Sequence, residues 1–272
     1  MIHFAPAKIN LGLHVLERRK DGYHNLQTVM VPTGLCDLIE ITALSEQTET
    51  LRFEQTGIPL EKESAVNLCV KAWELISRKA RIPSLLIHLH KQIPVGAGLG
   101  GGSSDATHTL MGINRWLENP LPEETLHAMA TSLGSDCPFF LYGQAMLAEG
   151  RGEILTPIHV ALQGYWLYLF HPGVHISTAE AYSGIQPSAD RPDLRNLLNQ
   201  PVQSWKEKVV NDFEYSVFRG YPGLREMKES IYAAGAVYAS MSGSGSAMYG
   251  LFPSPPVLSG ALARQILWKG LL

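Results

Sequence analysis

The sequence has few cysteines, no long apolar run and no marked excess of charge. Its three cysteines, Cys36, Cys69 and Cys137, are odd in number and form no CxxC pair. They argue against a disulfide framework and predict a cytoplasmic protein. No apolar stretch approaches the roughly 20 residues of a membrane helix. The first residues also lack the pattern of a secretory signal, so we expect no membrane partner.

Clustered basic residues are also missing. The 22 Lys and Arg residues are balanced by 25 Asp and Glu residues, and the strongest basic run, 18–20, is followed at once by an aspartate. We therefore expect no nucleic-acid partner. The length of 272 residues allows one large or two modest domains. The oligomeric state stays open between a monomer and a weak dimer.

Hydrophobic periodicity predicts a mixture of strands and helices without regular alternation, which favours an α+β fold. Strands are expected at 7–16, 24–31 (ending at Pro32), 38–43, 84–90, 145–149, 165–170, 236–241 and 247–252. Helices are expected at 64–79 with Ser64 as N-cap, from the glycine-rich loop to about Leu117, and at 122–133, 202–218, 221–234 and 257–269. A domain junction fits 156–164.

The segment 96–102 contains five glycines and is followed by Ser103-Ser104-Asp105, where a helix is expected to begin. Glycines let a backbone turn its N–H groups toward a ligand, and a helix N-terminus carries partial positive charge. Together they predict an anion site, most naturally for the phosphates of a nucleotide. A linker or tight turn is the alternative, but a linker would not join a patterned strand to a helix.

Two common nucleotide motifs do not account for this loop. A Walker A loop ends in Gly-Lys-Ser/Thr, whereas this one ends in Gly-Ser-Ser. A dinucleotide fingerprint matches literally at Gly96, Gly98 and Gly101, but residues 91–95 separate it from the preceding strand. The next predicted element is also a helix, so the context of that fingerprint is missing.

Three motifs, in this order, resemble the GHMP kinases, named for galactokinase, homoserine kinase, mevalonate kinase and phosphomevalonate kinase. They are Pro6-Ala7-Lys8-Ile9-Asn10, the loop from Pro94 to Ser104, and Gly243-Ser244-Gly245. Stretches 19–28, 134–139, 149–153, 171–178 and 211–214 are similar to one family among them, the cytidyl-methylerythritol kinases. The resemblance spans nearly the whole chain and is weakest over 44–62 and 183–210.

This resemblance implies a two-domain α+β fold with the active site in the cleft between the domains. The N-terminal ribosomal-protein-like α/β domain would cover 1–156, and the C-terminal ferredoxin-like domain 157–272. The implied reaction transfers the γ-phosphoryl group of ATP to the 2-hydroxyl of the methylerythritol moiety, in the non-mevalonate route to isoprenoid precursors. ATP is the implied co-substrate, Mg²⁺ is expected with it, and the partners are small molecules.

The resemblance also assigns the catalytic residues. Asp136 matches the catalytic aspartate and would accept the hydroxyl proton. Lys8 matches a lysine that contacts the reacting hydroxyl and that aspartate, and it would stabilise the transferred phosphoryl group. Without the resemblance, Asp136, which lies close to Pro138, would be interpreted as a helix N-cap. Lys8 would be interpreted as a solvated charge on the protein surface. Asn10 shares the face of Lys8 by the strand period and would bind the same polyol.

Further residues match the binding sites of the family. The implied ATP residues are Pro94, Gly96, Gly98, Leu99, Gly100, Gly101, Gly102, Ser103, Ser104, Asp105, Asn67 and Lys91. Asp105 stands where relatives often carry Asn, and Ser104 is a candidate to help hold Mg²⁺. An ordinary helix residue and a solvated charge remain equally good readings of Asn67 and Lys91. His88 and His90 share a strand face but have no third metal ligand in the sequence.

The implied substrate residues are Asn10, Tyr23, His24, Thr178, Tyr182, Gly243, Ser244 and Gly245. Tyr23, His24 and Tyr182 match the cytidine pocket, where aromatic faces would stack on the base.

Two rival functions stay open. One is another GHMP kinase, acting on homoserine or mevalonate, against which the Tyr23-His24 pair argues. The other is a non-enzymatic protein on a decayed kinase fold, against which the presence of Lys8 and Asp136 argues.

Overall fold

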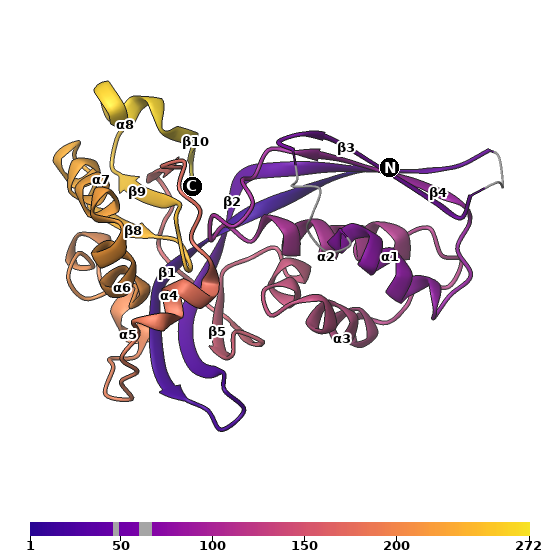
Figure 1. The fold of residues 1–272 in the computed structure, drawn as a ribbon, viewed down its shortest axis with the longest axis horizontal. Helices are drawn as coiled ribbons and strands as arrows, with labels where there is room; N and C mark the ends of the chain where they lie inside the picture. The colour runs from indigo at the N-terminus through magenta and orange to yellow at the C-terminus, as the bar shows by residue number, and fades with distance from the viewer. Residues whose placement is uncertain (46–48, 60–66) are drawn as a thin grey trace. The chain divides into compact units, whose positions relative to one another are not determined.

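The computed structural model describes residues 1–45, 49–59 and 67–272, and the chain divides into two compact units (Figure 1). Unit 1 consists of Met1–Ala7, Gly34–Val95 and Gly100–Gly143. Unit 2 consists of Lys8–Thr33, Gly96–Leu99 and Gln144–Leu272. Strands β1 (Ile2–Arg18) and β2 (His24–Ala43) contribute residues to both units. The mixture of strands and helices in each unit confirms the predicted α+β class.

Unit 1 is a sheet covered by helices. The second half of β2 pairs antiparallel with β4 (Leu85–Lys91), and β4 pairs parallel with β3 (Leu51–Gly57). Helices α1 (Leu68–Ser77), α2 (Gly101–Asn114) and α3 (Glu123–Leu133) lie together on one side of these strands in Figure 1, and the short helix η1 (Cys137–Leu141) follows them. Buried apolar side chains of the strands and helices form one core between the two layers. The period of two in β4 produces this core, because alternate leucine and isoleucine side chains point inward.

Unit 2 contains the first half of β2, which pairs with β5 (Met146–Gly150), and β6 (Ile154–Pro157), which pairs with β5. It also contains an antiparallel sheet in the order β10 (Ile266–Leu271), β7 (Trp166–Phe170), β9 (Met248–Phe252) and β8 (Tyr238–Met241). Its helical segments are α4 (Thr178–Ser183), α5 (Leu194–Leu198), η2 (Val202–Ser204), α6 (Phe213–Gly220), α7 (Pro222–Ala233) and α8 (Gly260–Arg264). Aromatic and aliphatic side chains of β7, β9, α6 and α7 form its core.

The prediction that Pro32 ends a strand is wrong, because β2 continues through it to Ala43. The β5 pairing of β2 covers Leu26–Met30, and the β4 pairing begins at Leu38. Pro32 lies between these two paired stretches. A residue without a backbone N–H is tolerated where the ladder does not require that donor.

Two predicted helices are also wrong. Within 202–218 the chain forms η2 and α6 but is extended near Asn211. There the Leu13 N–H donates to the Val210 carbonyl (2.9 Å), and the Asp212 N–H donates to the Leu13 carbonyl (2.8 Å). Within 257–269 only α8 is helical, and the chain then forms β10 against β7. In both places hydrogen bonds to a distant strand outweigh local helix propensity.

Helix α3 confirms the prediction for 122–133: Pro122 is its N-cap residue, and Gly134 is its C-cap residue. Helix α1 begins at Leu68 after Asn67, whose side chain accepts a hydrogen bond from the Cys69 N–H (2.8 Å). The predicted N-cap Ser64 lies outside the described residues. No helix within the described ranges is long and apolar enough to cross a membrane.

Candidate active site

Lys8 of β1 is buried in unit 2 and is held among oxygen atoms. Its ammonium donates to the Asn10 side-chain oxygen (2.6 Å) and to the Gly98 carbonyl (2.9 Å). The Asn10 amide in turn donates to the Thr28 hydroxyl (3.0 Å). The contact confirms that Lys8 and Asn10 share one strand face. The surface reading of Lys8 is wrong, because only 3% of this residue is exposed.

The first part of the glycine-rich loop contacts the late Gly-Ser-Gly segment within unit 2. The Ser242 hydroxyl donates to the Gly98 carbonyl (2.9 Å), and the Ala247 N–H donates to the Ala97 carbonyl (3.0 Å). A Cβ atom on Gly98 would lie 1.9 Å from the Ser242 carbonyl oxygen, so this position requires glycine. A Cβ on Gly243 would lie 3.1 Å from the Gly98 carbonyl oxygen. These backbone contacts hold the loop against the turn 242–245.

Three motifs that are far apart in the sequence therefore meet at one ammonium group. Lys8 comes from the first motif and Gly98 from the second. Gly243 comes from the third, where an added Cβ would lie 3.3 Å from the Lys8 nitrogen. The Asn211 amide fixes the third motif by donating to the Met241 and Gly243 carbonyls (both 2.8 Å). Unit 2 thus places a buried cation beside the loop that is predicted to bind phosphate.

The residues predicted to bind cytidine lie at the β1–β2 turn and on α4. The rings of His24 and Tyr182 are stacked, with centroids 4.8 Å apart and an interplanar angle of 20°. Tyr182 also contacts the Phe213 ring edge-on. Tyr23 is 57% exposed, and the Arg151 guanidinium lies 5.0 Å from its ring centroid. The structure thus pairs His24, rather than Tyr23, with Tyr182.

The other predicted substrate residues flank these rings and the third motif. Thr178 is the first residue of α4 and is exposed, and Ser177 caps that helix by accepting from the Glu180 N–H (3.1 Å). Ser244 is partly exposed, whereas Gly243 and Gly245 on either side of it are buried. Burial lowers the pKa of His24, and the nearby Arg18 charge adds to this effect. A neutral imidazole can both donate to and accept from a base edge.

In unit 1 the glycine-rich loop leads directly into α2. Gly100 is the N-cap residue, with a left-handed backbone (φ 71°), and it has no side chain to cover the first N–H groups of the helix. Those N–H groups and the helix dipole favour an anion. Ser103 is partly exposed at this end, whereas Ser104 is 0% exposed. The Ser104 carbonyl contacts the His108 Nδ1 (2.9 Å), and burial lowers the pKa of His108.

Asp136 lies in the turn between α3 and η1, and this turn is bound to α2. The Thr107 hydroxyl of α2 donates to the Cys137 carbonyl (2.9 Å), and the Cys137 N–H donates to the Gly134 carbonyl (3.2 Å). Asp136 is partly exposed and precedes η1, but its side chain makes no capping bond within this fully described segment. Asp136 thus occupies the N-cap position of η1, as the helix-cap reading has it, but without a side-chain capping bond. Unit 1 holds this carboxylate in a turn bound to the helix that begins at the glycine-rich loop.

Lys91, predicted as an ATP residue, is buried between two carboxylates. Its ammonium donates to Asp37 Oδ2 and to Asp105 Oδ2, the latter at 2.7 Å. Burial acts to lower the pKa of Lys91, but the two carboxylates outweigh it and raise that pKa. Burial also raises the pKa of Asp105 well above its usual value, although Lys91 opposes this change. The solvated-charge reading of Lys91 is wrong.

Sequence reasoning missed Asp37. It immediately precedes the predicted strand 38–43, and no motif marks it. Its only signal is a charged residue between Cys36 and Leu38 in a strand with many apolar positions.

Pro94, which opens the loop, is partly exposed. Leu99 is buried, and its carbonyl accepts from the Lys8 N–H (2.9 Å).

A metal ion would find few protein ligands here. In the parts of the chain that the structure describes, no group of three His, Cys, Asp or Glu side chains could hold a metal ion. His88 and His90 both contact the Thr56 hydroxyl (3.0 and 2.9 Å). Ser104 lies next to His108 and is fully buried.

Comparison with known protein families identifies two matching segments. Residues 67–144 match the GHMP kinases N terminal domain, and residues 192–264 match the GHMP kinases C terminal domain. The chain is 47% identical over 256 residues to the 4-diphosphocytidyl-2-C-methyl-D-erythritol kinase of Azobacteroides pseudotrichonymphae, covering 94% of each protein. It is 43% identical over 274 residues to the enzyme of that name from Parabacteroides distasonis, covering 100% of both.

Solved structures agree with these matches. A crystal structure of 4-(cytidine 5'-diphospho)-2C-methyl-D-erythritol kinase superposes with a TM-score of 0.79 at 35% identity, covering 92% of this chain and 90% of that one. The mevalonate kinase of L. major superposes with a TM-score of 0.70 at 16% identity, over 93% of this chain and 87% of that one. The second match shows a shared fold alone.

Proposed function

Because the chain belongs to the 4-diphosphocytidyl-2-C-methyl-D-erythritol kinase family of the GHMP kinases, we propose that the residues described above carry out the reaction of that family. The protein is an ATP-dependent kinase. It phosphorylates the 2-hydroxyl of 4-(cytidine 5'-diphospho)-2-C-methyl-D-erythritol in the non-mevalonate route to isoprenoid precursors. The main support for this site is that residues of all three motifs lie next to the Lys8 ammonium.

The glycine-rich loop and the N-terminus of α2 are proposed to bind the ATP phosphates. Helix α2 has 14 residues, so its dipole is well developed, and Gly100 leaves its first N–H groups uncovered. Gly96, Gly98, Gly101 and Gly102 bring the backbone close to the phosphates, and Ser103 supplies a hydroxyl at the helix start. Phosphoryl transfer depends mainly on positioning and charge neutralisation, which this arrangement supplies.

Asp136 is proposed as the general base. Its carboxylate takes the proton from the 2-hydroxyl as that oxygen attacks the γ-phosphorus of ATP. The bond from the γ-phosphorus to the bridging oxygen breaks, and ADP leaves with the electron pair. The bond between Thr107 and the Cys137 carbonyl keeps the Asp136 turn fixed to α2. This anchoring supports the assignment, because a base must be held in place relative to the phosphates.

Lys8 is proposed to stabilise negative charge on the transferred phosphoryl group. Its ammonium is buried, which strengthens its electrostatic effect, and Asn10 and Gly98 fix its direction. Asn10 is proposed to bind a hydroxyl of the methylerythritol moiety. The buried position of Lys8 supports this role, since a desolvated cation on a fixed strand needs little reorganisation during the reaction.

Tyr182 and His24 are proposed to recognise the cytosine base, with Tyr23 closing over it. The stacked rings of Tyr182 and His24 provide a preformed aromatic surface, and stacking on such surfaces contributes roughly 1–3 kcal/mol per base. Thr178 and the segment Gly243–Gly245 are proposed to line the rest of the substrate site. That Asn67 and Lys91 lie near the adenine of bound ATP stays a prediction.

We infer that Mg²⁺ enters with ATP and neutralises phosphate charge. Ser104, whose hydroxyl lies beside His108, stays a candidate to help hold this ion. We also propose a boundary between the two catalytic domains near residue 156 and a cytoplasmic location. The three cysteines, which are free thiols, support that location.

The deciding experiment is a phosphoryl-transfer assay with ATP and the cytidyl-linked methylerythritol substrate. ADP release and the phosphorus spectrum of the product would be measured, with homoserine and mevalonate as competing acceptors. We expect transfer to the 2-hydroxyl of the cytidyl substrate alone. Comparable kcat/KM with homoserine or mevalonate would contradict the proposed cytidine pocket.

A further inference from the structure

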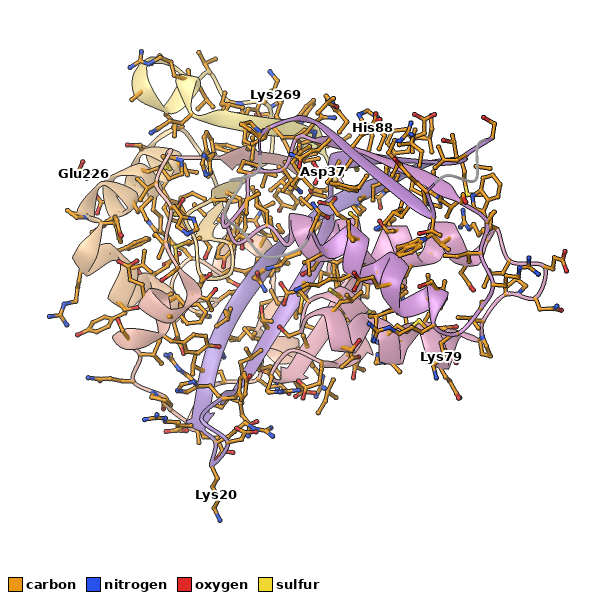
Figure 2. The ribbon with its side chains drawn as sticks, turned by 45° about the vertical axis from the view of Figure 1, so that its right-hand side comes forward. Lys20, Asp37, Lys79, His88, Glu226 and Lys269 are labelled. Atoms are coloured by element: carbon orange, nitrogen blue, oxygen red, sulfur yellow. The ribbon has the colours of Figure 1, made fainter. Side chains whose placement is uncertain are left out.

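Asp37 is a buried carboxylate of β2 that no motif identifies. It is 0% exposed, and it is labelled in Figure 2. One of its oxygens, Oδ1, accepts from the N–H groups of Gln92 (2.5 Å) and Ile93 (2.8 Å). Its other oxygen, Oδ2, accepts from the Lys91 ammonium. All three contacts fall on the residues that immediately precede the glycine-rich loop.

Lys91 extends this connection to the other side of the loop. Its ammonium also binds Asp105, which lies in the second turn of α2, at 2.7 Å. The Lys91 backbone is fixed as well, because its carbonyl accepts from the Ile58 N–H (2.8 Å). A Cβ atom on Gly101, the first residue of α2, would lie 2.9 Å from the Lys91 nitrogen and 2.8 Å from Ile93 Cγ2. The ammonium therefore sits directly against the start of the helix.

A cation at this place is unfavourable by itself, because the N-terminus of a helix already carries partial positive charge. The carboxylates of Asp37 and Asp105 compensate the positive charge of Lys91 and so make its burial tolerable. The group Asp37, Lys91 and Asp105 thus ties the end of β4 to the first turns of α2. The loop between these two ends is the proposed phosphate site.

We propose that Asp37 is a positioning residue for ATP: through Lys91 and Asp105 it joins the two flanks of the glycine-rich loop and fixes the loop's N–H groups for the phosphates. The inference rests on the loop being the phosphate site proposed above. Asp37 acts only through its neighbours, because a fully buried carboxylate cannot touch ATP. Its effect on activity is therefore confined to the geometry that it imposes on the loop.

The test is a pair of variants, Asp37→Asn and Asp37→Ala, in the full-length enzyme. KM would be measured separately for ATP and for the cytidyl substrate, together with kcat and thermal unfolding. We expect Asp37→Ala to raise the KM for ATP by about ten- to a hundredfold, because small misplacements of a binding group have effects of this order. Asp37→Asn should have a smaller effect, because its amide oxygen still accepts from the Gln92 and Ile93 N–H groups. The KM for the cytidyl substrate should stay unchanged in both.

Asn114→Ala is the matched control. Asn114 is buried at the opposite end of α2, where its side chain bonds the Leu121 N–H (2.7 Å) and carbonyl (3.2 Å). Its loss should lower the unfolding temperature without raising the KM for ATP. The proposal is overturned if the Asp37 variants behave like Asn114→Ala, or if both KM values rise together. Failure of the near-isosteric Asp37→Asn to fold would also overturn it, because Asp37 would then hold the core of unit 1 rather than the loop.

Gly100→Val separates this proposal from the one on which it rests. A β-branched side chain at that left-handed position should raise the KM for ATP if the loop binds phosphate. If Gly100→Val raises this KM and the Asp37 variants do not, only the positioning role fails. If Gly100→Val folds and leaves ATP binding unchanged, the phosphate-loop proposal itself fails.

Discussion

Lys8 in unit 2 and Lys91 in unit 1 are both buried, at 3% and 2% exposed, but different chemistry surrounds them. Lys91 is bound to the carboxylates of Asp37 and Asp105, which compensate its charge within the folded protein. Lys8 is bound to the neutral oxygens of Asn10 and Gly98, which orient its ammonium. The comparison teaches that burial alone does not separate a lysine that holds the core together from one with the catalytic role proposed for Lys8.

The largest effect is expected from replacing Asp136, the proposed general base in unit 1. Asp136→Asn should lower kcat by about 10²–10⁴-fold, because an amide cannot accept the hydroxyl proton. Its unfolding temperature should stay close to that of the wild type, since asparagine has nearly the same shape as aspartate. Steady-state kinetics and thermal denaturation measure both effects. A kcat near the wild-type value would remove Asp136 as the base.

Lys8→Met should lower kcat by about 10²–10³-fold, the size expected when one preorganised charge is removed from a transition state. Methionine has a similar length but no charge, so the chain around Asn10 should stay folded. Single-turnover measurements with saturating ATP would isolate the chemical step. Should Lys8→Met lose stability instead of rate, the two lysines would play the same structural part.

Lys91→Met should lower stability and, if the positioning role proposed for Asp37 holds, should also raise the KM for ATP, because that role acts through the Lys91 ammonium. The variant leaves Asp37 buried without its cation, and breaking a buried ion pair in this way costs about 3–5 kcal/mol. Urea denaturation measures the free energy of unfolding, and Lys79→Met, on the surface of the same unit, is the control (Figure 2). Lost ATP affinity without any loss of stability would instead make Lys91 the direct adenine contact that the sequence predicts.

Tyr182→Ala extends the comparison to ligands, because unit 2 carries the proposed cytidine pocket. Loss of one stacking surface costs roughly 1–3 kcal/mol. This corresponds to a rise of about five- to 150-fold in the KM for the cytidyl substrate. The KM for ATP should hardly move, and Phe at this position should retain most of the affinity. Titration of each variant with both ligands checks this, and an unchanged affinity for the cytidyl substrate places the pocket elsewhere.

The smallest expected effect is a pH dependence of stability that both units share. Burial lowers the pKa of His3 in unit 1, with help from Arg115, and it lowers the pKa of His14 in unit 2, where Asp212 opposes the change. Both imidazoles therefore bind a proton less readily in the folded protein than in the unfolded chain, where the ordinary pKa is about 6.5. The free energy of unfolding should fall as the pH drops below that value and through the lower folded pKa. Urea titrations between pH 5 and 7 measure it, and a flatter profile in His14→Leu is the confirming result.

Local sequence signals predicted the elements that depend on nearby residues. Pro122 and Gly134 bracket α3, alternating residues form β4, and the Ser-Gly-Ser-Gly turn joins β8 to β9. The predictions failed at 202–218 and 257–269, where the chain pairs with β1 and β7. A helical period in the sequence carries no information about a strand edge that lies far away along the chain.

The sequence by itself determined the α+β class, the family and the identity of the motif residues, because these depend on residue type and order. Only the tertiary structure decided which other residues contact these motif residues and hold them in place. Asp37 is 54 residues from Lys91, and nothing in the intervening chain indicates that they meet. The same holds for Lys8 and Gly98, which are 90 residues apart. Contacts over such separations form only when strands pair and helices pack, so their partners cannot be inferred from local pattern or propensity.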